Sequence, residues 1–83
     1  MKVTVKYFAS IREAVGQGAE SVETKAATVG ALRDELIARG GAYAQALARG
    51  KLVRIATDQV MTAEDAALRE GGEVAFFPPV TGG

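Results

Sequence analysis

The sequence contains neither cysteine nor histidine, and these two absences exclude several kinds of chemistry. Without cysteine the chain has no disulfide and no thiol nucleophile, and without histidine it has no imidazole acid or base. Zinc sites built from Cys and His ligands are excluded for the same reason, and we expect no metal site. An enzyme made from this chain alone would have to work with Asp, Glu, Lys, Arg, Ser, Thr and Tyr side chains.

An excess of charge and a long hydrophobic run are also missing. Ten basic and ten acidic residues cancel to a net charge of +0, whereas nucleic-acid-binding domains usually carry a basic excess. No apolar run approaches the ~20 residues that span a bilayer, and the first residues lack the apolar core of a signal peptide. We therefore expect a cytoplasmic protein with no nucleic-acid partner and no membrane partner.

The chain is short, and its length limits what it can enclose. Its 83 residues predict one domain. Apolar residues make up 48% of the chain, which is enough for a hydrophobic core. A chain of this size buries only about 60% of its unfolded surface. It does not easily enclose a ligand pocket of roughly 300 Å³ or more. These limits favour a protein that partner enzymes bind and use.

Hydrophobic periodicity predicts five strands and one main helix. Period-two alternation with glycine and proline punctuation predicts strands over 3–8, 19–24, 52–57, 60–61 and 73–77. Ser10 to Glu13 fits a capping box that opens a short helix, and Asp58-Gln59 fits a turn. Thr28 is the expected N-cap of the main helix, Gly40-Gly41 its expected end, and residues 43–49 a second short helical segment.

The main helix has an apolar stripe and a polar face. Val29, Leu32, Leu36 and Ile37 share the stripe, and Arg33 is expected to face water. The order β-β-α-β-β-β predicts an α+β fold of the β-grasp (ubiquitin-like) kind, a mixed sheet with one main helix on one face. We expect residues 1–77 to form this domain and residues 78–83 to form a flexible, extended C-terminal tail.

The tail ends in a bare carboxylate. Pro78 and Pro79 favour an extended exit from the last strand, followed by Val80 and Thr81, and Gly82 and Gly83 carry no side chains that would block a narrow channel. A terminal carboxylate that is adenylated gains a good leaving group, and a sulfur donor can then convert it to a thiocarboxylate. This scheme needs no cysteine on the chain. A glycine pair at a chain end also occurs in tails without any chemical role.

Three large apolar side chains are expected on the solvent side of the sheet. If Val3 and Val5 pack under the helix, strand parity turns Phe8 and Phe77 to the opposite face. The first and last strands are adjacent in a β-grasp sheet, so both rings would form one apolar patch that Met61 extends. The alternative is a bulge that shifts parity and buries either ring in the core.

These features together resemble the small subunit of molybdopterin synthase, the MoaD family of sulfur carriers. The residues that carry the likeness are 5–13 (VKYFASIRE), the helix over 28–36 and above all 72–83 (GEVAFFPPVTGG). One position departs from the family pattern, because Asp58 stands where members tend to have asparagine.

The resemblance implies a chemistry, a set of partners and a set of site residues. An ATP-dependent adenylating enzyme activates Gly83 as a glycyl adenylate, and a sulfur relay protein supplies the sulfur of the thiocarboxylate. The tail, with Gly82 giving access, enters the large synthase subunit and delivers sulfur for the dithiolene of molybdopterin. Two large and two small subunits form the heterotetramer, with the catalytic groups on the large subunit and no cofactor bound permanently to the small one. Partner-binding residues by this resemblance are Phe8, Met61, Phe77, Pro78, Pro79, Val80 and Thr81.

Three other functions remain open from the sequence. A thiamine-thiazole sulfur carrier shares the fold and the Gly-Gly tip, but those chains are shorter and lack the Phe-Phe-Pro-Pro-Val stretch. A ubiquitin-like modifier uses the same activation and forms isopeptide bonds with lysines. An interaction module with an inert tail would keep its activity without Gly83.

Overall fold

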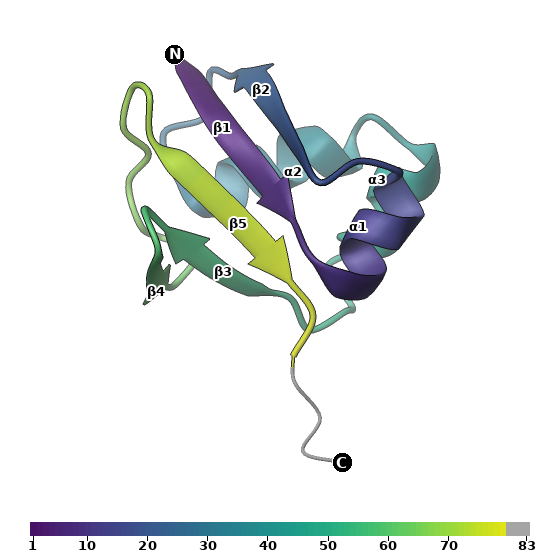
Figure 1. Cartoon of the computed structure of the whole chain (residues 1–83). Helices are drawn as coiled ribbons and strands as arrows, with labels where there is room; N and C mark the ends of the chain where they lie inside the picture. The colour runs from purple at the N-terminus through teal and green to yellow at the C-terminus, as the bar shows by residue number, and fades with distance from the viewer. Residues whose placement is uncertain (80–83) are drawn as a thin grey trace.

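A five-stranded mixed sheet with the order β2-β1-β5-β3-β4 is the centre of the computed structural model, which describes residues 1–79. The central strands β1 (Lys2–Tyr7) and β5 (Glu73–Phe77) run parallel, as Figure 1 shows. The other neighbours pair antiparallel, and these strands are β2 (Ala19–Glu23), β3 (Arg54–Thr57) and β4 (Val60–Thr62). The predicted adjacency of the first and last strands is therefore confirmed.

Helices lie on one side of the sheet, which leaves its other face open toward the viewer in Figure 1. The longest helix, α2 (Val29–Ile37), is capped at Thr28, whose hydroxyl accepts a hydrogen bond from the Ala31 N–H at 3.2 Å. The shorter helices α1 (Ala9–Val15) and α3 (Gly41–Ala46) contact each other. The predicted α+β, β-grasp architecture is confirmed. Among the described residues no helix is long and apolar enough to cross a membrane.

The core forms between the sheet and α2. Val3 and Val5 alternate with exposed or half-exposed neighbours on β1, as the period-two pattern predicts, and β5 adds Val74 and Phe76. Each such side chain, fully buried, stabilises the fold by about 1.5–3 kcal/mol relative to an exposed one. The remaining fully buried large side chains are Tyr7, Val29, Leu32, Leu36 and Leu47.

The predicted ends of two helices are wrong, for local reasons. Ser10 caps nothing, because α1 begins at Ala9 directly after β1 and its N-cap residue is Phe8 without a side-chain cap. The Phe8 N–H donates to the Phe76 carbonyl at 3.1 Å, and the Phe8 carbonyl accepts from the Ile11 N–H at 3.1 Å. This strand-like pairing fixes where the helix begins. The main helix α2 ends at Ile37, before the predicted Gly40-Gly41. Gly40, with a φ of +77°, is instead the N-cap residue of α3.

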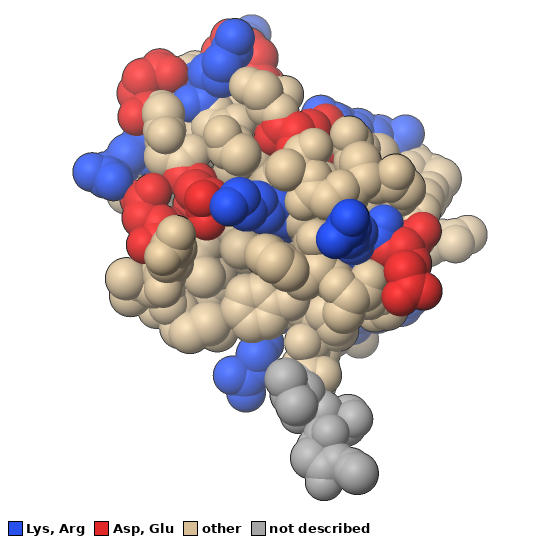
Figure 2. Space-filling view, in the orientation of Figure 1, with Lys and Arg blue, Asp and Glu red and all other residues tan. Residues whose placement is uncertain are grey.

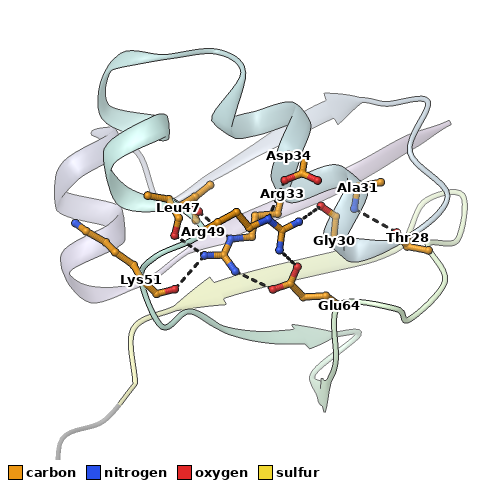
Figure 3. A network of polar contacts seen from close by, with 10 residues as sticks. Thr28, Gly30, Ala31, Arg33, Asp34, Leu47, Arg49, Lys51 and Glu64 are labelled. Carbon is orange, nitrogen blue, oxygen red and sulfur yellow. Dashed lines mark hydrogen bonds and ion pairs between the residues drawn. The ribbon is translucent and has the colours of Figure 1, made fainter.

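The prediction that Arg33 faces water is also wrong, because only 3% of this residue is exposed. Its guanidinium donates to the carbonyls of Leu47 and Ala48 at 2.8 Å each and of Lys51 at 3.1 Å, and it pairs with Glu64 at 2.8 Å (Figure 3). A buried guanidinium is tolerated only when its donors are satisfied in this way. Arg33 therefore fixes the loop between α3 and β3 to α2.

The predicted turn at Asp58-Gln59 is confirmed, and it links β3 to β4. Both residues have left-handed backbones, with φ of +48° and +71°, as a two-residue hairpin turn of the I′ type requires. The Asp58 carboxylate accepts from the Glu73 N–H at 3.1 Å and pairs with Arg69 at 2.8 Å. Aspartate at this position therefore closes the turn and also holds the segment that leads into β5.

Candidate functional site

Phe8 and Phe77 meet on the open side of the sheet. Their ring centroids lie 6.0 Å apart with an interplanar angle of 86°, an edge-to-face contact. Phe8 is 45% exposed although it is a large apolar residue, and Phe77 is half-buried against it. The β1–β5 register runs without interruption from Thr4–Glu73 to Tyr7–Phe76, so no bulge reverses the parity. The predicted position of both rings is confirmed.

Met61 extends the apolar surface from the other side. It is 51% exposed on β4 and lies opposite Ala56 on β3, which in turn lies opposite Ala75 on β5. Because directly paired residues share a face, the two alanines lie between Met61 and the aromatic pair. We call Phe8, Met61 and Phe77, with the buried Ala56 and Ala75 between them, the sheet-face patch. Sequence reasoning missed the alanines, although the parity of Ala75 with Phe77 was already a signal.

Charged side chains surround this patch. Lys6 lies opposite Ala75 on β1 and forms an ion pair with Glu73 at 3.1 Å, and exposed Arg54 lies opposite Phe77. Figure 2 shows the open face with uncharged residues gathered near the place where the tail leaves and with most charged residues farther away. An apolar centre with a polar rim is the usual composition of a protein-binding surface.

The root of the tail lies beside the same patch. Pro78 and Pro79 follow Phe77 directly and are half-buried. Pro78 also contributes to the wall of a shallow groove of about 180 Å³ with residues of α1, α3 and the α3–β3 loop. The remaining predicted tail residues, Val80, Thr81, Gly82 and Gly83, lie outside the described residues. The partner-binding and reactive roles of these tail residues therefore stay predictions.

Two acidic residues of the helical side, Asp34 and Glu64, form ion pairs with arginines. Asp34 pairs with Arg49 at 2.9 Å, and Glu64 contacts both Arg33 and Arg49 (Figure 3). The hydrogen bonds from Arg49 hold the pKa of each of these two carboxyls below its ordinary value. They are therefore ionised at neutral pH and engaged in ion pairs. Within residues 1–79 no three acidic residues lie close enough together to hold a metal ion.

A second polar cluster joins β1, β2 and α3. The Glu20 carboxylate accepts from the hydroxyls of Tyr7 and Tyr43 at 2.7 and 2.8 Å and pairs with Arg39 at 3.1 Å. Burial by itself would raise the pKa of Glu20, but these hydrogen bonds outweigh it and hold the pKa below its ordinary value. Burial and the bond to Glu20 raise the pKa of Tyr7, so its hydroxyl stays a donor. This cluster positions α3, and its one carboxylate, that of Glu20, is engaged by three donors.

Comparison with known proteins places this chain in a family. The family model described as "ThiS family" matches residues 5–83. The chain is 46% identical over 81 residues to the molybdopterin synthase sulfur carrier subunit of Escherichia coli strain K12 and 42% identical over 81 residues to that of Haemophilus influenzae. Each alignment covers 98% of this chain and 99% of the relative.

Solved structures give the same picture of the fold. SAMP1 from Haloferax volcanii is 28% identical, with a TM-score of 0.78 and full coverage of both chains. A chain in the complex of subunits 1 and 2 of the molybdopterin-converting factor from Helicobacter pylori 26695 is 23% identical, with a TM-score of 0.69 and full coverage of both chains. At that identity the second likeness shows the fold alone.

Proposed function

Because this chain belongs to the ThiS family and, within it, to the molybdopterin synthase sulfur carrier subunits, we propose that Gly83 carries the sulfur that this synthase transfers. The curated relatives that match almost the whole chain carry this name, which favours molybdopterin over thiazole as the end product. The observation that carries the proposal is the position of the sheet-face patch at the root of the tail, since Phe77 ends β5 and directly precedes Pro78.

The chemistry proceeds in two activation steps and one transfer. The Gly83 carboxylate attacks the α-phosphate of ATP on an adenylating enzyme, which forms the glycyl adenylate and releases pyrophosphate. Sulfur at the oxidation level of sulfide, which a relay protein supplies, displaces AMP from the acyl carbon and leaves the thiocarboxylate. Nucleophilic attack by this sulfur on the precursor begins formation of the dithiolene of molybdopterin. Water then cleaves the bond between the sulfur and the Gly83 carbonyl carbon, which leaves the sulfur on the precursor and restores the carboxylate. Glycine at positions 82 and 83 suits all three steps, because a bare backbone enters a narrow channel and adopts varied dihedrals at little cost.

The partner of the carrier is the large synthase subunit, in a heterotetramer of two large and two small chains. The sheet-face patch supports a docking partner, because large apolar side chains as exposed as Phe8 and Met61 are typical of a protein-binding surface. The acids and bases of the transfer belong to the large subunit in this proposal. In agreement with that, hydrogen bonds from tyrosine hydroxyls and Arg39 hold the pKa of Glu20 below its ordinary value, and hydrogen bonds from Arg49 do the same for Asp34 and Glu64.

Intact-mass spectrometry tests the proposal. The purified chain is incubated with an adenylating enzyme, ATP and a sulfur donor, and we expect the exchange of one oxygen for one sulfur at Gly83. The chain that lacks Gly83 is the control and should remain unchanged. The loaded chain, mixed with the large subunit and the pterin precursor, should then yield molybdopterin. If a competent enzyme produces no exchange, or if removal of Gly83 leaves the transfer intact, the carrier function is wrong.

One comparison favours a second function, that of a protein modifier. The solved H. volcanii protein is a small archaeal modifier protein, and it covers the whole of this chain. In such a modifier the activated C-terminal glycine is attacked by a lysine amine, which forms an isopeptide bond, instead of by sulfur. Isopeptide-linked conjugates of the tagged chain in cells, absent when Gly83 is deleted, would establish this activity.

A further inference from the structure

A shallow groove lies beside the tail root, on the side of α1 and α3. Its lining combines apolar residues, which include Ile11 and Ala14 of α1 and Val53 of the loop that precedes β3, with the polar Ser10 and Gln45, and Pro78 contributes to the same wall. Leu52, another lining residue, is 80% exposed, so its side chain buries little apolar surface within this chain. This groove is distinct from the sheet-face patch, because none of the patch residues lines it.

The size and charge of the groove indicate what fits in it. A volume of about 180 Å³ is smaller than the roughly 300–1,000 Å³ of small-molecule sites, so the groove suits a protruding side chain rather than a metabolite. Lys51 is the one charged residue among the described residues that line it. Its side chain extends away from the Arg33 guanidinium in Figure 3, while its carbonyl accepts from Arg33. The apolar part of the wall beside one ammonium group favours an aliphatic side chain with a carboxylate next to it.

The length of the tail brings a partner against this groove. Four residues follow Pro79, and four extended residues span at most about 14 Å. A protein that acts on the Gly83 carboxylate must therefore bring its reaction centre within this distance of Pro79. The surface of that protein around its reaction centre then contacts the residues around the root of the tail. The groove belongs to this region, because Pro78 lines it.

We propose that the groove is a second docking site for the large synthase subunit, which inserts an aliphatic side chain there and places a carboxylate next to Lys51. The inference rests on the proposed function, since the large subunit is the partner that receives the tail. It adds contacts on the helical side of the tail root to those of the sheet-face patch. The tail is then held from both sides, which fixes the direction in which it enters the partner.

Binding of the full chain to the large subunit tests the groove by titration calorimetry. Leu52→Asp places a carboxylate where the partner's own is expected, and Lys51→Glu removes the complementary charge. We expect the Kd to rise at least about tenfold for Leu52→Asp. For Lys51→Glu we expect a smaller rise, and the Kd of this variant should depend less on salt than that of the wild type. Lys25→Glu is the matched control, because Lys25 is exposed and follows β2 at the end of the sheet opposite the tail. Its Kd should stay within about twofold of the wild type.

The outcomes separate this inference from the function on which it rests. Thermal unfolding of each variant is measured first, and no loss is expected at the exposed Leu52 and Lys51 side chains. If the wild type binds and transfers sulfur while both groove variants bind as tightly as Lys25→Glu, the groove is not a docking site and the carrier function stands. If the wild type does not bind the large subunit at all, the proposed function and this inference are both wrong.

Discussion

The edge-to-face contact between Phe8 and Phe77 joins the beginning of the chain to the root of its tail. Phe8 directly follows β1 and Phe77 ends the parallel strand β5, and the ring centroids lie 6.0 Å apart. Any displacement of β5 relative to β1 would move both the apolar patch and the tail that follows it. The sheet therefore positions the sheet-face patch and the root of the tail together.

Phe77→Ala is expected to weaken binding more than it lowers stability. Phe77 is half-buried on the open face, so its loss leaves the core under α2 intact. At the centre of an interface, by contrast, truncation of an aromatic anchor costs about 2 kcal/mol or more. Calorimetric titration with the large subunit and thermal unfolding of the free variant measure the two effects. A large loss of stability with unchanged affinity would mean that Phe77 serves the fold alone.

A double-mutant cycle measures the contact between the two rings. Phe8→Ala, Phe77→Ala and the double variant are compared by urea denaturation. An aromatic pair in this geometry contributes about 0.5–1.5 kcal/mol beyond the area that it buries. We expect a coupling free energy of unfolding in that range. Additive effects of the two substitutions would show that the rings do not stabilise each other.

Arg33→Met is expected to be among the most destabilising single substitutions in the helical layer. Methionine fills the buried path of the side chain, but the carbonyls of Leu47, Ala48 and Lys51 lose their donor. We expect the free energy of unfolding to fall by about 3 kcal/mol, measured by urea denaturation. Arg69→Met, which removes an exposed ion pair with Asp58, is the control and should change stability little. Equal effects of the two would contradict the role assigned to Arg33.

The Glu20 cluster makes stability sensitive to acid. Because the folded pKa of Glu20 is below its ordinary value of 4.5, its contribution is fully present above that pH. It is lost as the pH falls through the folded pKa. Urea denaturation of the wild type and of Glu20→Gln at pH 7 and at pH 3 should show a smaller decrease for the variant. A decrease of the same size in both would contradict the ionised hydrogen-bonded cluster.

Gln59→Gly is expected to stabilise the β3–β4 turn. Gln59 has a φ of +71°, a left-handed conformation that costs a non-glycine residue about 1–2 kcal/mol. Glycine removes this cost but adds entropy to the unfolded chain, so the net gain should be about 0.5–1 kcal/mol. The melting temperature reports the change. Gln45→Gly in α3, a helical position, should lower the melting temperature instead.

Local sequence was sufficient to predict those features that depend on interactions within a short segment. The alternation of Val3 and Val5 with polar neighbours fixed the buried face of β1, because side chains on a strand point to opposite sides in turn. Thr28 was identified as an N-cap, because its hydroxyl needs only the N–H three residues ahead. The parity that put Phe8 and Phe77 on the open face follows from the same local rule.

Only the tertiary structure decided the features that depend on partners distant in the sequence. Arg33 lies four residues after Val29, within the apolar stripe of α2, and only its charge indicated a solvent-facing position. Its burial is tolerated because the α3–β3 loop brings carbonyls to its guanidinium. The capping pattern at Ser10 failed because Phe8 pairs with β5, and Ala56 joined the patch because strand register set it between Ala75 and Met61. Hydrophobic alternation and helix caps act over a few residues, whereas burial of a charge and the register of strands depend on long-range packing.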